Sequence, residues 1–309
     1  MLIQVMSVAA FAVGPPLENF CEPFNGKNCD VIWAAPSNLP ASVKIYAVVP
    51  TKFSPSTISN LLQIAELTPK NKRRSTQDGV LGGKDVLVYA NKKDTRHLDI
   101  IPSQGAIGLG IDGTIAQIPK EMPVGVPDDK EALRLVLDIL GKIGISRSEL
   151  ATSHDGKTLL SFSEASVLHK DKSTGQIVTN VVRRGINLTR RIEGIPVWGD
   201  AGVSAKFGNE GKLAYLSVVW RAIKPAQDCP ISNSTEFISH IKSGHALIRS
   251  EQAGTRYKKL TVNKVQLYYW ENEGSKPQST IYPFAVLNAK TGLPGENANL
   301  ELFVPFANQ

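Results

Sequence analysis

The sequence predicts an α+β fold of two or three modules, in each of which a helix covers an antiparallel β-sheet. Helical stripes of apolar residues recur at 55–66, 128–143 and 235–248, and runs of alternating apolar and polar residues follow each of them. The 309 residues are 42% hydrophobic and 20% charged, which is ordinary for a globular protein. The spacing of the helices is uneven, which excludes a solenoid repeat.

Residues 1–30 combine an apolar start with a cysteine loop. The start, MLIQVMSVAAFAVG, is uncharged, and Ala10-Phe11-Ala12 fits a small-x-small cleavage site. We therefore expect a signal-like segment and a secreted or other extracytoplasmic protein; a buried N-terminal strand is the alternative. Cys21 and Cys29 flank a short loop, so in an oxidising compartment their spacing predicts a disulfide, with Cys229 left over.

The stretch 31–118 is expected to form an N-terminal α+β module. Ser54 as the N-cap and Pro55 in the first turn predict a helix with a core-facing apolar stripe. Apolar runs typical of strands occupy 43–50, 84–90, 96–101 and 105–111. A polar, basic and glycine-rich loop separates the helix from the later strands.

The stretch 119–127 contains three prolines, which exclude regular structure and predict a linker. The region 128–309 that follows is expected to hold one or two further modules, with a boundary near 226–234. Asp128 and Glu131 form a capping box at the start of its first helix, and Gly144 ends that helix. Its second helix is predicted at 235–248, with Ser234 or Thr235 as the cap and Gly244 as a weak point inside it.

A three-strand antiparallel meander is predicted between 183 and 225. Its β-runs cover 186–193, 197–207 and 212–221. Gly194 and Pro196 break the first two runs, and Gly208-Asn209-Glu210-Gly211 forms the turn before the third. One face of the third run carries Leu216, Val218 and Trp220. This alternation is typical of a half-buried sheet, so we expect Trp220 on the buried face.

The stretch from Arg191 to Leu213 has the pattern R-x-x-G-I-P-V-x-G-x-x-x-x-V-x-x-x-x-x-G-K-L. This pattern resembles the central hairpin of PepSY and FTP domains, which are the propeptide modules of thermolysin-like metalloproteases and their free-standing relatives. The resemblance implies a PepSY/FTP-like α+β region within 128–309. Propeptide relatives act as chaperones and inhibitors of the attached protease, and we expect no attached protease here. The resemblance thus implies a protein that binds or regulates another protein in trans.

The centre of this resemblance is Gly194-Ile195-Pro196-Val197, next to Trp198. We expect a structural role: Gly194 permits a kink or a bulge, and Pro196 stands where the ladder needs no N–H donor. The alternative is that Val197 and Trp198 contact the protein partner directly.

The residue patterns predict no catalytic, cofactor or metal site. Gly108-x-Gly110-x-x-Gly113 matches the dinucleotide spacing, but TIAQIPKEMP follows it instead of a helix. His240 and His245 are five residues apart and would point in different directions from a helix. We therefore expect a non-catalytic protein; the rival interpretation is a hydrolase whose site is assembled from distant residues.

The formal net charge of +7 is spread over scattered basic pairs. No aromatic stacking motif accompanies these pairs, so we expect no nucleic-acid partner. A basic surface that binds an anionic cell-envelope polymer is a further alternative.

No apolar run reaches the roughly 18 residues of a membrane-spanning helix. Asn187 and Asn233 lie in glycosylation sequons, which matter only in an exported eukaryotic protein.

Overall fold

The structure is a computed structural model, and it describes residues 21–36, 39–73, 86–111, 122–153, 156–170, 175–199, 201–249, 257–272, 274, 276–291 and 299–306. The signal-like segment expected at 1–20 and the first part of the expected linker, 119–121, lie outside these ranges. Within them, no helix is long and apolar enough to cross a membrane.

The chain divides into two units, each assembled from segments that are far apart in the sequence. Val48–Lys224 and Glu271–Ser279 form what we call the central unit. Met1–Ala47, Pro225–Trp270 and Thr280–Gln309 form the terminal unit. The predicted α+β class is confirmed. The division differs from the expected one, because 119–127 does not separate the units.

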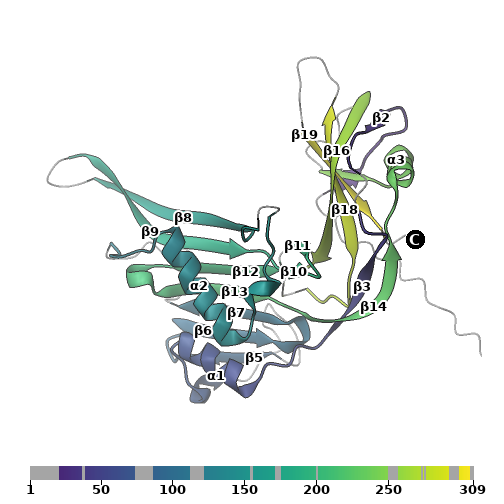
Figure 1. The fold of residues 1–309 in the computed structure, drawn as a ribbon. Helices are drawn as coiled ribbons and strands as arrows, with labels where there is room; N and C mark the ends of the chain where they lie inside the picture. Colours follow the sequence, from purple (N-terminus) through teal and green to yellow (C-terminus); the bar gives the residue numbers. More distant parts are fainter. Residues whose placement is uncertain are drawn as a thin grey trace, which may run out of the picture. The chain divides into compact units, whose positions relative to one another are not determined.

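The central unit is built on an eight-stranded antiparallel sheet (Figure 1). Its strands are β4 (Lys72–Arg73), β5 (Leu87–Ala90), β6 (Arg96–Ile101), β7 (Ala106–Ile111), β8 (Leu160–Lys170), β9 (Ile177–Leu188), β12 (Gly202–Phe207) and β13 (Leu213–Val219). They lie in the order β4-β5-β6-β7-β13-β12-β9-β8. Short 3₁₀ turns occupy Pro69–Asn71, Pro102–Gln104, Arg147–Glu149 and Asn209–Gly211.

Two helices, α1 (Pro55–Ile64) and α2 (Asp129–Ile143), pack on this one sheet (Figure 1). Their ends follow the sequence signals. The Ser54 hydroxyl accepts the N–H of Thr57 at 3.0 Å, and the Asp128 carboxylate accepts the N–H of Glu131 at 2.7 Å. Gly144 has a φ of 87° and ends α2, because glycine enters the left-handed region without a side-chain clash.

One hydrophobic core spans the expected module boundary. Leu98 and Leu109 come from before the proline-rich stretch, Val136 and Leu216 from after it, and all four belong to the same buried cluster. The reason is direct strand pairing between β7 and β13, from Ala106↔Val219 to Tyr215↔Gly110. The separate N-terminal module expected at 31–118 is therefore not found.

The predicted meander is present as β9, β12 and β13, which pair antiparallel in that order. The structure adds one feature that the sequence did not predict. A small hairpin of β10 (Arg191–Ile192) and β11 (Ile195–Gly199) is inserted between β9 and β12. The first two expected runs therefore correspond to four strands.

The strands of the terminal unit follow the order β1-β15-β19-β18-β16 in a second sheet, with β2 parallel to β16. The bounds are β1 (Cys21–Pro23), β2 (Asp30–Trp33), β15 (Leu247–Arg249), β16 (Lys259–Glu271), β18 (Pro283–Thr291) and β19 (Asn299–Pro305). Helix α3 (Ser234–Ser243) places Phe237 and Ile241 in the core on one face of this sheet. Trp33 of β2 stacks on Phe237 with the ring centroids 5.5 Å apart.

Helix α3 is shorter than expected. Gly244 has a φ of 82° and acts as its C-cap, and Leu247–Arg249 form β15 instead of a further helical turn. The residue interpreted as a weak point inside a helix is thus its stop signal. At the other end, Asn233 is the N-cap instead of Ser234 or Thr235, and its side chain accepts the N–H groups of Thr235 and Glu236.

A third sheet joins β14 (Ala222–Pro230), β3 (Ser42–Val49) and β17 (Thr280–Ile281). Each of these strands lies where the chain passes from one unit to the other or next to that point. The expectation that every sheet carries its own helix is wrong. Helices α1 and α2 share one sheet, because the two segments that bear them are joined through β7 and β13.

The expected disulfide between Cys21 and Cys29 is also wrong, since none of the three cysteines is bonded to another. Cys21 lies on β1 opposite Arg249 of β15. Cys29 packs in the terminal core, where burial raises the pKa of its thiol and Asp30 raises it further. The two side chains are held by different structural neighbours, and spacing along the chain alone did not reveal this.

Candidate functional site

The hairpin of β10 and β11 contains the residues that the sequence singled out around Gly194. Ile192 pairs with Ile195, so Glu193 and Gly194 form a two-residue loop. Both have positive φ, 47° and 85°, as a type I′ turn requires. Gly194 therefore serves a tight turn and not the kink or bulge that we expected.

The neighbouring residues fit a hairpin equally well. Pro196 pairs with Arg191. In the next pair along the ladder, the N–H of Val197 donates to the carbonyl of Arg190 at 2.9 Å. Hydrogen-bonded and non-hydrogen-bonded pairs alternate in an antiparallel ladder, so Pro196 needs no donor toward β10. Val197 is buried and Trp198 is half-buried. Glu193 and Gly194 of the turn are exposed.

We expect Gly194→Val to lower the free energy of unfolding by about 1–2 kcal/mol, because a β-branched residue resists a positive φ. No heavy atom lies within 4 Å of the position that a Cβ would take, so the cost comes from the backbone alone. Gly194→Asn is the matched control, since asparagine tolerates this region, and it should melt close to the parent. Urea denaturation compares the three proteins. A valine variant with unaltered stability that no longer binds its partner would instead identify this corner as the contact surface.

Trp220 follows β13, and its surroundings differ from the simple buried face that we expected. Leu216 and Val218 are buried, whereas Trp220 is half-buried at the rim of the same core. Its indole Nε1 donates to Glu149 Oε2 at 2.9 Å. The guanidinium of Arg190 lies over its ring, 5.0 Å from the centroid. Trp220 therefore connects the core to a network of charged residues.

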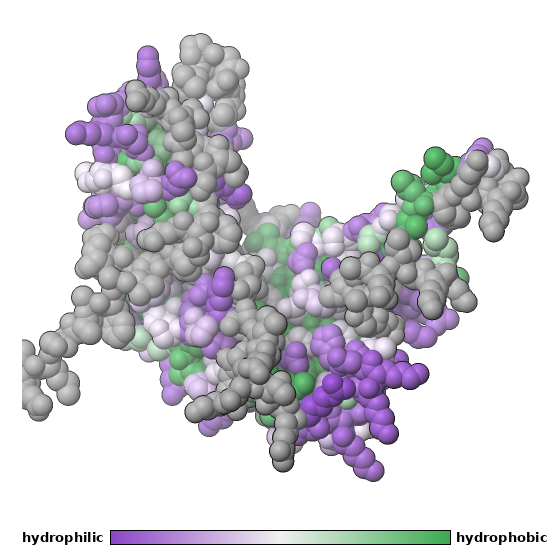
Figure 2. All heavy atoms as spheres, turned by 180° about the vertical axis from the view of Figure 1, so that it is seen from behind, coloured by the Kyte–Doolittle hydropathy of each residue, from purple (hydrophilic) through white to green (hydrophobic). Residues whose placement is uncertain are grey.

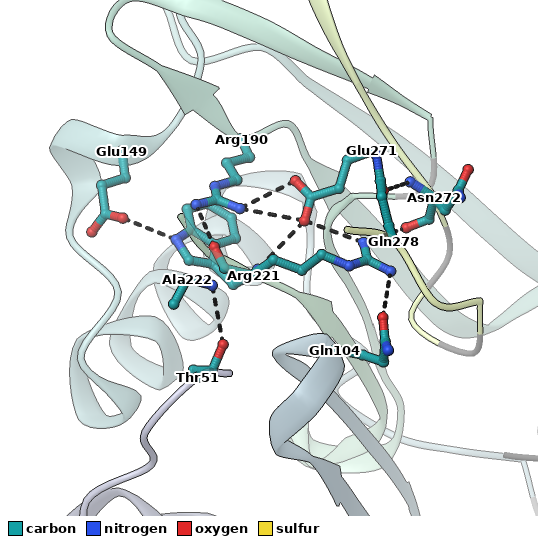
Figure 3. A network of polar contacts seen from close by, with 10 residues as sticks. Thr51, Gln104, Glu149, Arg190, Arg221, Ala222, Glu271, Asn272 and Gln278 are labelled. Atoms are coloured by element: carbon teal, nitrogen blue, oxygen red, sulfur yellow. Dashed lines mark hydrogen bonds and ion pairs between the residues drawn. The ribbon is translucent and has the colours of Figure 1, made fainter. Parts of the chain in front are cut away.

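This network consists of Arg190, Arg221 and Glu271, and Figure 3 shows it from close by. Arg190 Nη1 lies 3.1 Å from one oxygen of Glu271, and Arg221 Nη1 lies 3.2 Å from the other. The side chains of Arg221 and Glu271 are fully buried, and that of Arg190 is 6% exposed. Two cations thus share a single carboxylate in the interior.

Backbone carbonyls accept further N–H groups of both arginines. Arg190 donates to the carbonyl of Arg221 at 2.9 Å, and Arg221 donates to those of Asn272 and Lys276 at 2.7 and 3.0 Å. Burial lowers the pKa of the Arg221 guanidinium, and the charge of Glu271 opposes that shift. Both oxygens of Glu271 are occupied by arginine, so this carboxylate holds segments together and is not placed as a base.

The sequence did not indicate this network. Arg190 and Arg191 appeared only as one of several basic pairs, and Glu271 stood in an apolar run without a distinguishing pattern. The available signal was alternation: on an extended chain adjacent residues point to opposite sides, so Arg190 and Arg191 could not both face solvent.

The outer edge of β8 is a second feature of the central unit. This strand has 11 residues and ends the sheet, and no described strand pairs with its outer side. The other terminal strands are short or protected: β4 has two residues and β1 has three, whereas β14 contains Pro225 and Pro230. Natural proteins protect long edges against pairing with other chains by prolines, charged residues and bulges. β8 has no proline, but it contains Glu164 and Lys170, and its register with β9 shifts once, between Ala165 and Ser166.

The far part of the β8–β9 hairpin exposes apolar side chains (Figure 2). Leu168 is 68% exposed and Ile177 is 75% exposed. Over the same residues the two strands pair only with each other, since β12 pairs with β9 from Arg184 to Leu188. An exposed apolar patch on a projecting ribbon is typical of a protein contact.

No group of three or more His, Cys, Asp or Glu side chains is placed to hold a metal ion in the parts of the chain that the structure covers. His240 and His245 do approach each other, with ring centroids 5.8 Å apart. Burial lowers the pKa of His240, and the neighbouring His245 lowers it further.

Comparison with known proteins identifies no family. No family model matches the chain. No curated protein matches it either. Among solved structures, an uncharacterised protein from Eubacterium rectale is similar with a TM-score of 0.46 and 10% sequence identity, over 89% of this chain and 86% of that chain.

Proposed function

We propose that this protein binds another protein, and that an extended segment of the partner adds as a further strand to the outer edge of β8. The observation that carries the proposal is an 11-residue terminal strand whose outer side has no described neighbour. Such an edge presents a row of backbone N–H and C=O groups ready for pairing. Main-chain hydrogen bonds would then supply affinity, and side-chain pockets on either face would supply specificity.

The composition of β8 supports this use. Ser163 to Ser166 are exposed and mostly small, so a partner strand can approach closely. The charged residues of β8 are Glu164 and Lys170. Glu164 forms an ion pair with Arg184 at 3.1 Å. At the far end, the exposed Leu168 and Ile177 offer an apolar contact to the same partner.

The resemblance of residues 191–213 to PepSY and FTP hairpins supports the same class of function, as do the apolar first residues. In this proposal the protein acts outside the cytoplasm and regulates its partner in trans, as an inhibitor or a chaperone. The proposal needs no cofactor, and the hairpin at Gly194 and the network around Glu271 serve to hold the sheet in shape.

Two proline variants test the edge. Successive N–H groups of a strand alternate between its two sides where its pairing is regular, and the register of β8 against β9 shifts between Ala165 and Ser166. On the regular part before that shift, one of Ser163→Pro and Glu164→Pro therefore removes a donor toward β9 and the other a donor toward the outer edge. The outer-edge variant should melt within about 1 kcal/mol of the parent and still lose the partner. The other variant should be clearly less stable.

The measurement has two parts. Proteins captured by the parent from the native secretome are compared with those captured by the stable proline variant, and hydrogen exchange then follows the β8 amides in the reconstituted complex. Loss of capture together with protection of these amides in the parent complex supports the proposal. Equal capture by both proteins would refute it. Concentration-dependent dimerisation of the parent, abolished by the same proline, would identify the added strand as a second copy instead.

A further inference from the structure

The sheet of the terminal unit carries a polar groove on the face opposite to α3. Its volume is about 560 Å³, within the range of roughly 300–1,000 Å³ that is typical of ligand sites. The side chains that define it are Arg249, Lys264, Gln266, Asn288, Lys290 and Glu301. The opposite face is occupied by the apolar core under α3.

Strand register arranges these side chains in a transverse row. Lys264 of β16 pairs with Asn288 of β18, and Asn288 pairs with Glu301 of β19. Arg249 of β15 then reaches Glu301 at 3.2 Å. The row across four strands therefore reads cation, amide, carboxylate, cation. Lys290 lies two residues further along β18, on the same face.

A bulge shapes the groove. The register of β16 against β18 shifts between Val262 and Lys264, which leaves Asn263 as an extra residue. A bulge bends its strand and redirects the side chains beside it. Here Asn263 and Lys264 both line the groove. Bulges often lie next to binding sites for this reason.

The charge of the groove is unbalanced. It contains three cations and one carboxylate, and that carboxylate is already paired with Arg249. Neither Lys264 nor Lys290 forms an ion pair with any residue that the structure describes, and both are exposed. An anion that enters the groove would therefore meet two uncommitted ammonium groups.

Aromatic residues continue the same face of the sheet beyond Gln266. Tyr268 follows Gln266 on the same face of β16, and its ring stacks on Phe284 at 5.8 Å. Burial raises the pKa of the Tyr268 hydroxyl, and the charge of Glu301 raises it further.

We propose that this groove binds an acidic oligosaccharide, with carboxylates at Lys264 and Lys290 and hydroxyls at the amides of Asn288 and Gln266. Side-chain amides both donate and accept, which suits hydroxyl groups. An acidic peptide would suit the groove less well, because every peptide unit brings an N–H and a C=O that need partners. The floor of the groove is a sheet face, whose own backbone groups are already paired in the ladder.

The test is a calorimetric titration of the full chain with oligogalacturonate, a polymer of carboxylated sugars. Binding should saturate, and it should weaken as salt is raised, because the contacts are charge-assisted and partly exposed. Lys264→Glu combined with Lys290→Glu should weaken binding at least ~tenfold. The double variant Lys264→Gln with Lys290→Gln should also weaken binding, but by less, because it removes the two charges without reversing them.

Lys130→Glu is the matched control, since it changes the charge of an exposed lysine on α2 in the other unit. It should bind like the parent.

Asn288→Ala should weaken binding, as the lysine variants do, which a purely electrostatic contact would not show. A neutral maltooligosaccharide should not bind. The proposal is refuted if oligogalacturonate does not saturate, if Lys130→Glu loses as much affinity as the groove variants, or if oligoglutamate binds as tightly as the sugar. None of these outcomes depends on the β8 edge, so the two proposals can fail separately.

Discussion

Glu271→Gln should lower the free energy of unfolding of the central unit by about 3–5 kcal/mol, the range seen when one partner of a buried ion pair is removed. Glutamine has nearly the same shape, so packing is preserved and the change is electrostatic. Arg190 and Arg221 would keep their backbone acceptors but lose the carboxylate that they share. Two buried cations would then lie side by side without the carboxylate that both of them contact. Urea denaturation followed by circular dichroism measures the effect.

The control for this prediction is Glu301→Gln. That carboxylate also pairs with an arginine, Arg249 at 3.2 Å, but its side chain is 37% exposed. Exposed pairs contribute roughly 0–1 kcal/mol, so this variant should unfold close to the parent. Similar small effects at both positions would mean that burial does not isolate the Glu271 network from water, and the structural role assigned to it would be wrong.

Trp220→Ala should cost about 3–5 kcal/mol of the free energy of unfolding, as large-to-small changes against a core usually do. Three contributions act together: the ring packs on the core with Leu216 and Val218, its N–H donates to Glu149, and its face receives Arg190. The loss of the ring would also admit water beside the buried guanidinium. Thermal and urea denaturation of the variant give the result.

Trp220→Phe separates these contributions. Phenylalanine keeps most of the apolar contact and an aromatic face for Arg190 but cannot donate to Glu149, so we expect a loss of about 1 kcal/mol. If the alanine variant melts like the parent, the ring is not an anchor and the meander is stabilised elsewhere. If both variants lose the same amount, the hydrogen bond and not the packing carries the effect.

Local signals in the sequence predicted the local structure well. Asp128 and Gly144 marked the two ends of α2, and Ser54 marked the start of α1. The turn at 208–211 connects β12 and β13 as predicted, and Gly211 has a φ of 67° there. Each of these signals rests on interactions within a few residues, which a sequence displays directly.

Pairings between distant segments could not be predicted in the same way. Nothing in the alternation of 106–111 indicates that this strand pairs with 215–219, because period two reports which face is buried and not which neighbour it has. The hairpin at Glu193 and Gly194 was missed since its strands have only two and five residues, and Gly194 had been interpreted as an interruption. The Glu271 network was missed for the same reason as the pairing of β7 with β13. Its members are distant in the sequence and meet only in the folded chain.

The discontinuous central unit has a consequence for how the protein is made. Residues 48–224 contain both buried arginines, but the carboxylate that neutralises them belongs to the short return segment Glu271–Ser279. A ribosome releases the chain from its N-terminus at about 5–20 residues per second, so this charge arrives only after most of the protein has been synthesised. Until then Arg190 and Arg221 must stay hydrated, so the part of the core around them cannot pack. Folding of this chain is thus expected to complete late in translation, with a partly open intermediate exposed to chaperones until residue 279 has emerged.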